Sequence, residues 1–88
     1  MTTKTLTTSD AIEVVYDVLA GVAPEVDSDE IDTSVDLTEQ LDLDSMDYLH
    51  WLVGINEATG IEIPDRDASE FLTIDSAAKY LVERSDRA

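Results

Sequence analysis

The residues with the clearest chemical potential lie near the middle of the chain, in the run from Leu41 to Asp47, which reads LDLDSMD. This run follows a long loop and opens a predicted helix, so the hydroxyl of Ser45 is accessible there. The backbone N–H groups and the dipole of a helix N-terminus stabilise a phosphate group attached at such a position. Serine is also strongly favoured as a residue that caps a helix. The pattern therefore indicates either a modification site at Ser45 or an ordinary helix cap.

A third interpretation of Ser45 is a catalytic nucleophile, which needs a general base within hydrogen-bond reach. The chain has one histidine, His50, and five helical residues at about 100° each turn its side chain well away from Ser45. The sequence also lacks the G-x-S-x-G elbow of serine hydrolases. We therefore expect a protein without catalytic activity.

Two clusters of aspartates could instead offer oxygen ligands to a divalent cation. An EF-hand loop requires glycine at its sixth position and glutamate at its twelfth, and neither cluster has this pattern. The chain has no cysteine, so thiolate metal sites and disulfides are excluded. We predict no specific metal site and only weak cation binding that relieves charge repulsion. The two clusters are Asp27, Asp29 and Asp32, and Asp42, Asp44 and Asp47.

The charge balance is strongly acidic, because the 88 residues include 21 Asp and Glu but only 5 Lys and Arg, for a formal net charge of −16. Such a surface repels phosphate backbones and anionic lipids, so nucleic acids and membrane surfaces are poor partners and cationic proteins are good ones. Between Lys4 and Arg66 there is no lysine or arginine at all. The hydrophobic content of 43% still indicates a folded domain rather than a disordered acidic tail.

The length suits one domain, predicted over residues 1–88 with an ordered core from about residue 8 to about residue 84. The N-terminus has no apolar signal core. The longest apolar run, from Trp51 to Ile55, is too short to span a bilayer. We therefore expect a monomeric, cytoplasmic protein without a membrane span.

Start and stop signals predict three longer helices and one short helix, which together make a small all-α four-helix bundle. The first helix is predicted to begin at Thr8, Ser9 or Asp10, with Glu13 completing a capping box, and to stop at Gly21. The loop over residues 24–44 contains isolated apolar anchors and a short turn over residues 37–41, so it is predicted to be tied down. The apolar stripe of the first helix, at i, i+3, i+4 and i+7, is Ile12, Val15, Tyr16 and Leu19.

The next helix is predicted to begin at Asp44 or Ser45 and to end at Gly60. It carries more apolar residues than one buried stripe needs, so part of its apolar surface should be exposed, which is common at contact sites. Asp65 is then predicted to cap one short turn over residues 65–70.

The last helix is predicted to be capped by Thr73, with Arg84 and Arg87 near its negatively polarised end. Its apolar stripe repeats the spacing of the first helix and comprises Ile74, Ala77, Ala78 and Leu81.

The tripeptide Asp44-Ser45-Met46 resembles the Asp-Ser-Leu motif of acyl and peptidyl carrier proteins, in which 4′-phosphopantetheine is esterified to the serine hydroxyl. The similarity extends from about Ser9 to Leu81 and implies a non-catalytic phosphoprotein with an acyl-carrier-protein-like fold. Such a carrier holds its cargo as a thioester on the pantetheine thiol, so the chain itself needs no cysteine. Around the motif, the resemblance includes Leu37, Leu41, Glu62-Ile63-Pro64-Asp65, Ala68, Ala77, Tyr80 and Leu81.

The resemblance implies that Ser45 is the attachment point and that Asp44 helps to position it for a phosphopantetheinyl transferase. Enzymes that load and unload the cargo would dock through basic patches, and an acidic surface raises the rate of such docking. An acyl chain would lie partly between the helices, with Ile63 and Ala68 near its entrance. The implied partner-binding residues are Asp44, Met46, Asp47, Leu49, His50, Val53 and Glu57.

Several assignments within this helix have more than one interpretation. Leu49 belongs either to the partner face or to the core, and Gly54 permits either close helix packing or space beside an acyl chain. His50 is a partner contact, a pH sensor or an ordinary surface residue. We assign Trp51, Leu52 and Ile55 to the core, the first because large aromatic side chains are generally buried.

The cargo is not determined by the sequence. The resemblance favours an acyl carrier of fatty-acid, polyketide or specialised acyl metabolism, and the departures from the family pattern also suit an aminoacyl or peptidyl carrier of a dedicated pathway. An unmodified acidic adaptor, with Ser45 as a plain cap, is the remaining alternative. The departures are Asp42 for the usual glycine, Met46 for the usual leucine, and His50, Trp51 and Gly54 in the docking helix.

Overall fold

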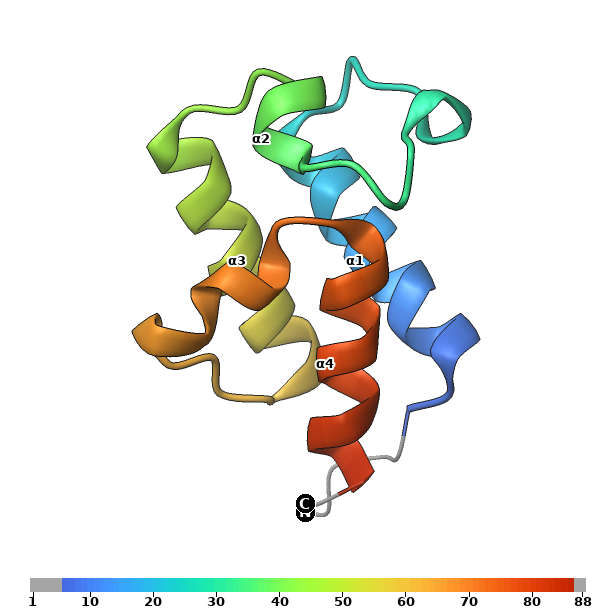
Figure 1. Cartoon of the computed structure of the whole chain (residues 1–88), viewed down its shortest axis with the longest axis vertical. Helices are drawn as coiled ribbons and strands as arrows, with labels where there is room; N and C mark the ends of the chain where they lie inside the picture. The colour runs from blue at the N-terminus through green and yellow to red at the C-terminus, as the bar shows by residue number, and fades with distance from the viewer. Residues whose placement is uncertain (1–5, 87–88) are drawn as a thin grey trace.

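The computed structural model describes residues 6–86, which form a bundle of helices without a strand in that range (Figure 1). Three helices are long, and the shorter ones lie in the connections between them, which confirms the predicted small all-α bundle. Arg87 lies outside the described residues. The elements are α1 (Thr8–Val22), the 3₁₀-helix η1 (Ser28–Glu30), α2 (Leu37–Gln40), α3 (Ser45–Thr59), the 3₁₀-helix η2 (Asp65–Phe71) and α4 (Ile74–Asp86).

The cap of α1 lies earlier than the sequence pattern predicted. The hydroxyl of Thr7 accepts the N–H of Asp10 at 3.1 Å, and the carboxylate of Asp10 accepts the N–H of Thr7 at 3.3 Å. This capping box uses Asp10 as its acidic member, so the prediction that Asp10 pairs with Glu13 is wrong by one turn. Gly21 keeps a helical conformation, and α1 ends one residue later, at Val22.

The core is built around the indole ring of Trp51 in α3. Trp51 has no exposed surface, and its Nε1–H donates to the backbone oxygen of Val15 in α1 at 3.2 Å. The ring of Phe71, also fully buried, meets it edge-on with 6.0 Å between centroids. The assignments of Trp51 and Ile55 to the core are confirmed. The buried cluster comprises Ala11, Val15, Leu19, Leu37, Trp51, Ile55, Ile61, Phe71, Ile74, Ala77, Ala78 and Leu81.

Gly54 lies where α3 packs closely against α1. A Cβ placed on Gly54 would lie 2.5 Å from Cγ1 of Val18, closer than two carbon atoms can pack. Of the two roles considered for Gly54, the structure therefore supports close helix packing. Glycine costs about 1 kcal/mol relative to alanine inside a helix, and the contact between α1 and α3 offsets that cost.

Helix α4 has the cap and the buried stripe that the sequence predicts, whereas the start of η2 differs from its prediction. The hydroxyl of Thr73 accepts the N–H of Ser76 at 3.0 Å, so the predicted cap of α4 is confirmed, as is its buried stripe. In η2, by contrast, the position before the helix is Pro64, whose fixed φ of −64° suits the start of a helix without a side-chain cap. The prediction that Asp65 caps this turn is therefore wrong.

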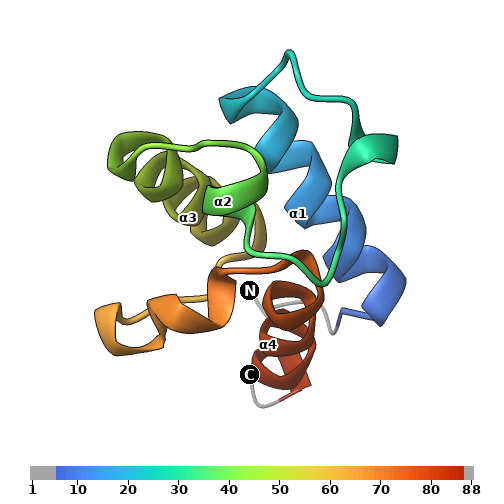
Figure 2. The ribbon, with the colours of Figure 1, turned by 45° about the horizontal axis from the view of Figure 1, so that its top comes forward.

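The three long helices do not all run the same way. In Figure 1, α1 runs opposite to α3 and α4, and in Figure 2 the segment η2 lies between α3 and α4. The long loop before α3 is fixed to the first turn of α4 and to the connection before it, because Asp75 N–H donates to Thr33 O at 3.0 Å and Leu37 N–H donates to Leu72 O at 2.7 Å. Within residues 6–86, every helix falls short of the length and apolar character that crossing a bilayer requires.

Candidate functional site

The first turn of α3 shows which residue caps this helix. Asp44 has extended backbone angles, φ −84° and ψ 177°, and its Oδ1 accepts the N–H of Asp47 at 2.8 Å. Ser45 is therefore the first helical residue rather than the cap. The interpretation of Ser45 as an ordinary helix cap is not supported, because Asp44 already fills that role.

The side chain of Ser45 is exposed at the start of α3. Among the described residues, none forms a hydrogen bond with its hydroxyl. The partial positive charge of the helix N-terminus lies next to it and favours an attached anion such as a phosphodiester. This arrangement leaves the hydroxyl accessible for a covalent bond and suits the charge of the group that the sequence pattern predicts.

The loop that delivers the chain to Ser45 contains an unusual backbone conformation at Asp42. Its φ of +54° is the only positive φ of a non-glycine residue in the described part of the chain. Aspartate tolerates this left-handed region better than most residues, but glycine adopts it at lower cost. Leu41 and Leu43, on either side, are half-buried against the core and hold the loop in place.

Helix α3 has an apolar face outside the core in addition to its buried one. The exposed fractions are 57% for Met46, 49% for Leu49 and 45% for Val53, although all three are large apolar side chains. This answers the question left open for Leu49, which is not part of the core. Leu52, assigned to the core, is half-buried and packs against the core cluster. An exposed apolar strip of this kind is typical of a contact surface.

The charged side chains of α3 and its cap are all carboxylates, and the same surface also carries His50. Asp44, His50 and Glu57 are exposed, whereas Asp47 is half-buried and uses its N–H to complete the cap. The lysine and arginine side chains that the structure describes lie elsewhere, on η2 and α4. They are Arg66, Lys79 and Arg84.

A shallow groove of about 280 Å³ lies between the outer side of α3 and the segment that leads into η2. It is in line with Ser45, because Leu49, Leu52 and Asn56 follow at i+4, i+7 and i+11 on the same side of the helix. The groove therefore begins about one helical turn from the hydroxyl. Its lining is apolar at Leu49, Leu52, Val53 and Ile63 and polar at Asn56, Glu62 and Asp65.

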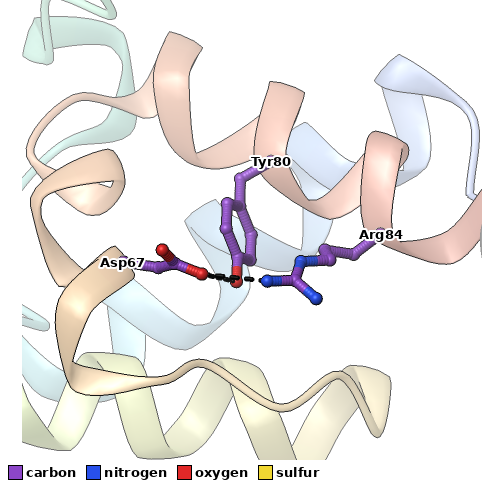
Figure 3. Close-up of polar contacts among 3 residues, drawn as sticks. All are labelled: Asp67, Tyr80 and Arg84. Atoms are coloured by element: carbon purple, nitrogen blue, oxygen red, sulfur yellow. Dashed lines mark hydrogen bonds and ion pairs between the residues drawn. The ribbon is translucent and has the colours of Figure 1, made fainter.

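The segment η2 is held between α3 and α4 by polar contacts from two tyrosines. On one side, the hydroxyl of Tyr48 in α3 donates to the backbone oxygen of Ala68 at 2.6 Å. On the other side, the hydroxyl of Tyr80 and the guanidinium of Arg84 each donate to Oδ2 of Asp67 at 2.9 Å (Figure 3). Both donors come from α4, so their convergence on one carboxylate oxygen fixes η2 to that helix.

The surroundings of Asp67 and Tyr48 shift the pKa of each group. The hydrogen bond from Tyr80, together with the hydrogen bond and charge of Arg84, lowers the pKa of Asp67 below its ordinary value. Burial, and to a smaller extent the carboxylate of Asp36, raises the pKa of Tyr48, so its hydroxyl stays a neutral donor.

The Asp67 contacts were not predicted from the sequence. The i, i+4 spacing of Tyr80 and Arg84 is a signal that the two side chains meet, and the guanidinium carbon does lie 5.1 Å from the Tyr80 ring centroid. Nothing in the sequence pairs them with Asp67, which is on another element. Across the described residues, no three His, Asp or Glu side chains are grouped closely enough to hold a metal ion, the predicted aspartate clusters included.

The candidate site lies within a region of the chain that matches a known protein family. Residues 13–81 match the family model described as "Phosphopantetheine attachment site". The chain is 34% identical over 83 residues to the acyl carrier protein of Rickettsia massiliae, covering 92% of this chain and 94% of that protein. It is 36% identical over 58 residues to the acyl carrier protein of Rubrobacter xylanophilus, covering 66% of this chain and 72% of that one.

The fold is similar to that of a solved carrier as well. The acyl carrier protein of Enterococcus faecalis superposes with a TM-score of 0.74 at 20% identity, over 90% of this chain and 99% of that chain. At this identity the likeness concerns the fold alone, and it agrees with the helical bundle described above.

Proposed function

The chain belongs to the acyl carrier protein family, and from that premise we propose that Ser45 carries 4′-phosphopantetheine and that the outer face of α3 presents it to partner enzymes. Members of this family are non-catalytic carriers, and their cofactor is phosphopantetheine. The observation that carries the assignment is the hydroxyl of Ser45, which is exposed at the first position of α3 and has no hydrogen-bond partner among residues 6–86. Ser45 also lies within the residues that match the family model.

Attachment of the cofactor is a phosphoryl transfer from coenzyme A. A phosphodiester bond forms at Oγ of Ser45, the pyrophosphate bond of coenzyme A breaks, and the nucleoside bisphosphate and the hydroxyl proton leave. Asp44 holds the first turn in place through its cap, which supports its proposed role in positioning Ser45. When bound, the cofactor supplies a thiol that holds an acyl group as a thioester.

The docking surface that we propose consists of the exposed apolar strip and its acidic rim. Met46, Leu49 and Val53 give a partner an apolar contact, while Asp47 and Glu57 attract a basic patch on that partner. Long-range attraction of this kind raises the association rate more than the affinity, so a partner leaves quickly after each transfer. His50 lies exposed on the same helix and would contact the partner.

The modifying enzyme would be a phosphopantetheinyl transferase, and the later partners would be enzymes that handle acyl groups. The cargo that we propose is an acyl group of fatty-acid, polyketide or specialised acyl metabolism. An aminoacyl or peptidyl cargo is the second candidate, because α3 carries His50, Trp51 and Gly54 where the family pattern has acidic, aliphatic and small residues.

The attachment site can be tested by incubating the purified protein with coenzyme A and a promiscuous phosphopantetheinyl transferase. Mass spectrometry should show a mass gain of one phosphopantetheine on the wild type and none on Ser45→Ala. Ser9→Ala is a matched control, because Ser9 is another exposed serine in the first turn of a long helix. It should gain the same mass as the wild type.

Two other results would contradict the proposal. A mass gain on Ser45→Ala would move the attachment site to another residue. No gain on the wild type or on either variant would support the unmodified adaptor instead. Circular dichroism of Ser45→Ala should match the wild type, because Asp44 and not Ser45 caps α3.

A further inference from the structure

The residue with a left-handed backbone before α3 has no part in the proposed function so far. Asp42 has a φ of +54°, although it is not a glycine. Aspartate adopts this region mainly where its short side chain forms a hydrogen bond with the nearby backbone. The carboxylate of Asp42 is exposed and forms no hydrogen bond or ion pair with any of residues 6–86. The usual local compensation for this conformation is therefore missing.

The neighbours of Asp42 fix its position in the loop. Leu41 and Leu43 are half-buried and pack against the core, and the N–H of Leu41 donates to Leu37 O at 3.0 Å. The connection between α2 and α3 runs along the outside of the bundle (Figures 1 and 2). The carboxylate between these two anchors therefore stays in solvent. A charge held in this way is preorganised for a contact, which lowers the entropic cost of binding.

The charge of Asp42 is also not matched by a nearby cation of the same chain. Neither α3 nor the loop over residues 24–44 contains a lysine or an arginine. The nearby carboxylate of Asp44 has a structural task, because its Oδ1 accepts the N–H of Asp47. Asp42 has no such task and occupies a conformation that costs stability, a combination that is typical of functional positions.

An enzyme that acts on Ser45 covers Asp42 as well. Three residues of chain span at most about 11 Å, so the two Cα atoms lie within that distance of each other. A protein–protein interface covers about 800 Å² of each partner, which corresponds to a disc with a radius of about 16 Å. A carboxylate that is covered without a partner loses its hydration, and binding is weakened. The enzyme must therefore supply a group that compensates the charge.

We infer that Asp42 is a specificity-determining residue for the modification of Ser45, and that its carboxylate selects a transferase with an arginine or lysine opposite residue 42. This inference rests on the proposed attachment at Ser45. A charge-assisted hydrogen bond to that cation forms only in the complex, where it offsets the desolvation of the carboxylate. A transferase with an apolar or acidic group at this place buries the carboxylate unpaired and is disfavoured.

The test measures modification of the full chain by a transferase that acts on acyl carrier proteins and has a basic docking surface. Initial rates from mass spectrometry, at increasing concentrations of the carrier, give kcat and KM separately. The rates are measured at low ionic strength and in about 1 M salt, where the Debye length falls to about 3 Å. Asp42→Asn removes the charge but keeps a residue that tolerates a positive φ. Asp42→Gly removes both the charge and the strain.

At low ionic strength, both variants should lower kcat/KM about fivefold or more, chiefly through a higher KM, because a hydrogen bond between charged groups is lost. The difference should shrink in high salt. Asp42→Gly should melt at a higher temperature than the wild type and still be modified more slowly, which a purely structural role would not produce. The matched control is Asp17→Asn, which neutralises an exposed carboxylate of α1 and should leave kcat/KM within about twofold.

The other outcomes overturn the inference in different ways. If Asp42→Asn is modified as fast as the wild type at low ionic strength, the transferase does not contact this carboxylate. If Asp17→Asn is slowed to the same extent, the net charge of the chain and not the position of Asp42 is the determinant. If only Asp42→Gly is slowed, the backbone conformation is recognised instead. If the wild type and every variant remain unmodified, the proposed attachment at Ser45 itself fails.

Discussion

Helices α3 and α4 have similar lengths, 15 and 13 residues, but they distribute their apolar side chains differently. In α4, the predicted apolar stripe is completely buried, and the rest of the helix is mainly polar or charged. In α3, the buried residues Trp51 and Ile55 face inward, while Met46, Leu49 and Val53 remain between 45% and 57% exposed on another side. The apolar stripe of α4 therefore contributes to the core alone, whereas the apolar residues of α3 are divided between the core and an exposed surface.

This difference separates the stability of the protein from its proposed function. An apolar residue on α4 contributes to folding because its burial removes it from water. An apolar residue on the outer side of α3 contributes little to folding and is available to a partner. Substitutions on the two helices should therefore give different combinations of stability and activity.

The largest expected effect comes from making the same substitution on the two helices. Leu81→Ala removes a fully buried side chain of α4 and should lower the free energy of unfolding by about 2–5 kcal/mol. Leu49→Ala removes a side chain that is 49% exposed and should change it by no more than about 0.5 kcal/mol. Urea denaturation followed by circular dichroism measures both, and Leu49→Ala should in addition slow modification by the transferase. If Leu81→Ala and Leu49→Ala lowered the free energy of unfolding equally, the contrast between the buried stripe of α4 and the exposed strip of α3 would be contradicted.

A smaller effect is expected at Gly54, where α3 packs closely against α1. Gly54→Ala should lower the free energy of unfolding by about 1 kcal/mol, because the new methyl group collides with Val18 and outweighs the gain in helix propensity. Thermal unfolding of the single variants and of Gly54→Ala with Val18→Ala completes a double-mutant cycle. The double variant should be more stable than the sum of the single effects predicts. If Gly54→Ala were more stable than the wild type, the contact between α1 and α3 could accommodate the added methyl group.

At Asp42, before α3, a stabilising change is expected. Asp42→Gly relieves the positive φ of 54° at the cost of greater freedom in the unfolded chain, for a net gain of about 0.5 kcal/mol. The melting temperature should rise slightly, whereas Asp42→Val should lower it. A lower melting temperature for Asp42→Gly would mean that the aspartate side chain stabilises the loop in a way that outweighs its backbone strain.

The smallest effect concerns the contact of α4 with η2, and it depends on pH. The folded-state pKa of Asp67 is lowered, first through the hydrogen bond from Tyr80, so its contribution to stability is fully present above the ordinary carboxyl pKa of about 3.9. The contribution is lost as the pH falls through the lowered pKa. Asp67→Asn should therefore melt below the wild type at neutral pH, and the difference should shrink in acid.

The control for this experiment is Asp65→Asn, because Asp65 is an exposed carboxylate on the same segment and forms no hydrogen bond with a described residue. Its difference from the wild type should stay small and change little over the same pH range. A constant difference between the wild type and Asp67→Asn would contradict the assigned role of the ionised carboxylate.

The sequence was sufficient to predict the features that depend on local patterning. The stripe of α4, its cap at Thr73 and the end of α3 at Gly60 were all predicted, because each follows from spacing or from one residue with a special backbone preference. The exposed strip of α3 was also predicted, since the helix has too many apolar residues for one face. The assignments that failed, at Asp10 with Glu13 and at Asp65, concern helix starts where several neighbouring residues can act as the cap.

Features that depend on contacts between distant segments could not be predicted in this way. The sequence left the role of Gly54 open, because only the position of Val18 on another helix decides it. The contacts of η2 with Tyr48 and Tyr80 likewise join residues 20 and 13 positions apart. At the candidate site, the sequence allowed either Asp44 or Ser45 to cap α3, and the backbone geometry was needed to assign the cap to Asp44.

The lysine and arginine side chains that the structure describes are confined to two elements of the fold. They sit on η2 and α4, whereas α3 and the loop before it carry carboxylates and neither lysine nor arginine. A positively charged enzyme would attract these carboxylates from a distance, and the attraction would favour approaches in which the α3 surface comes first. More encounters would then begin with the proposed attachment site facing the partner.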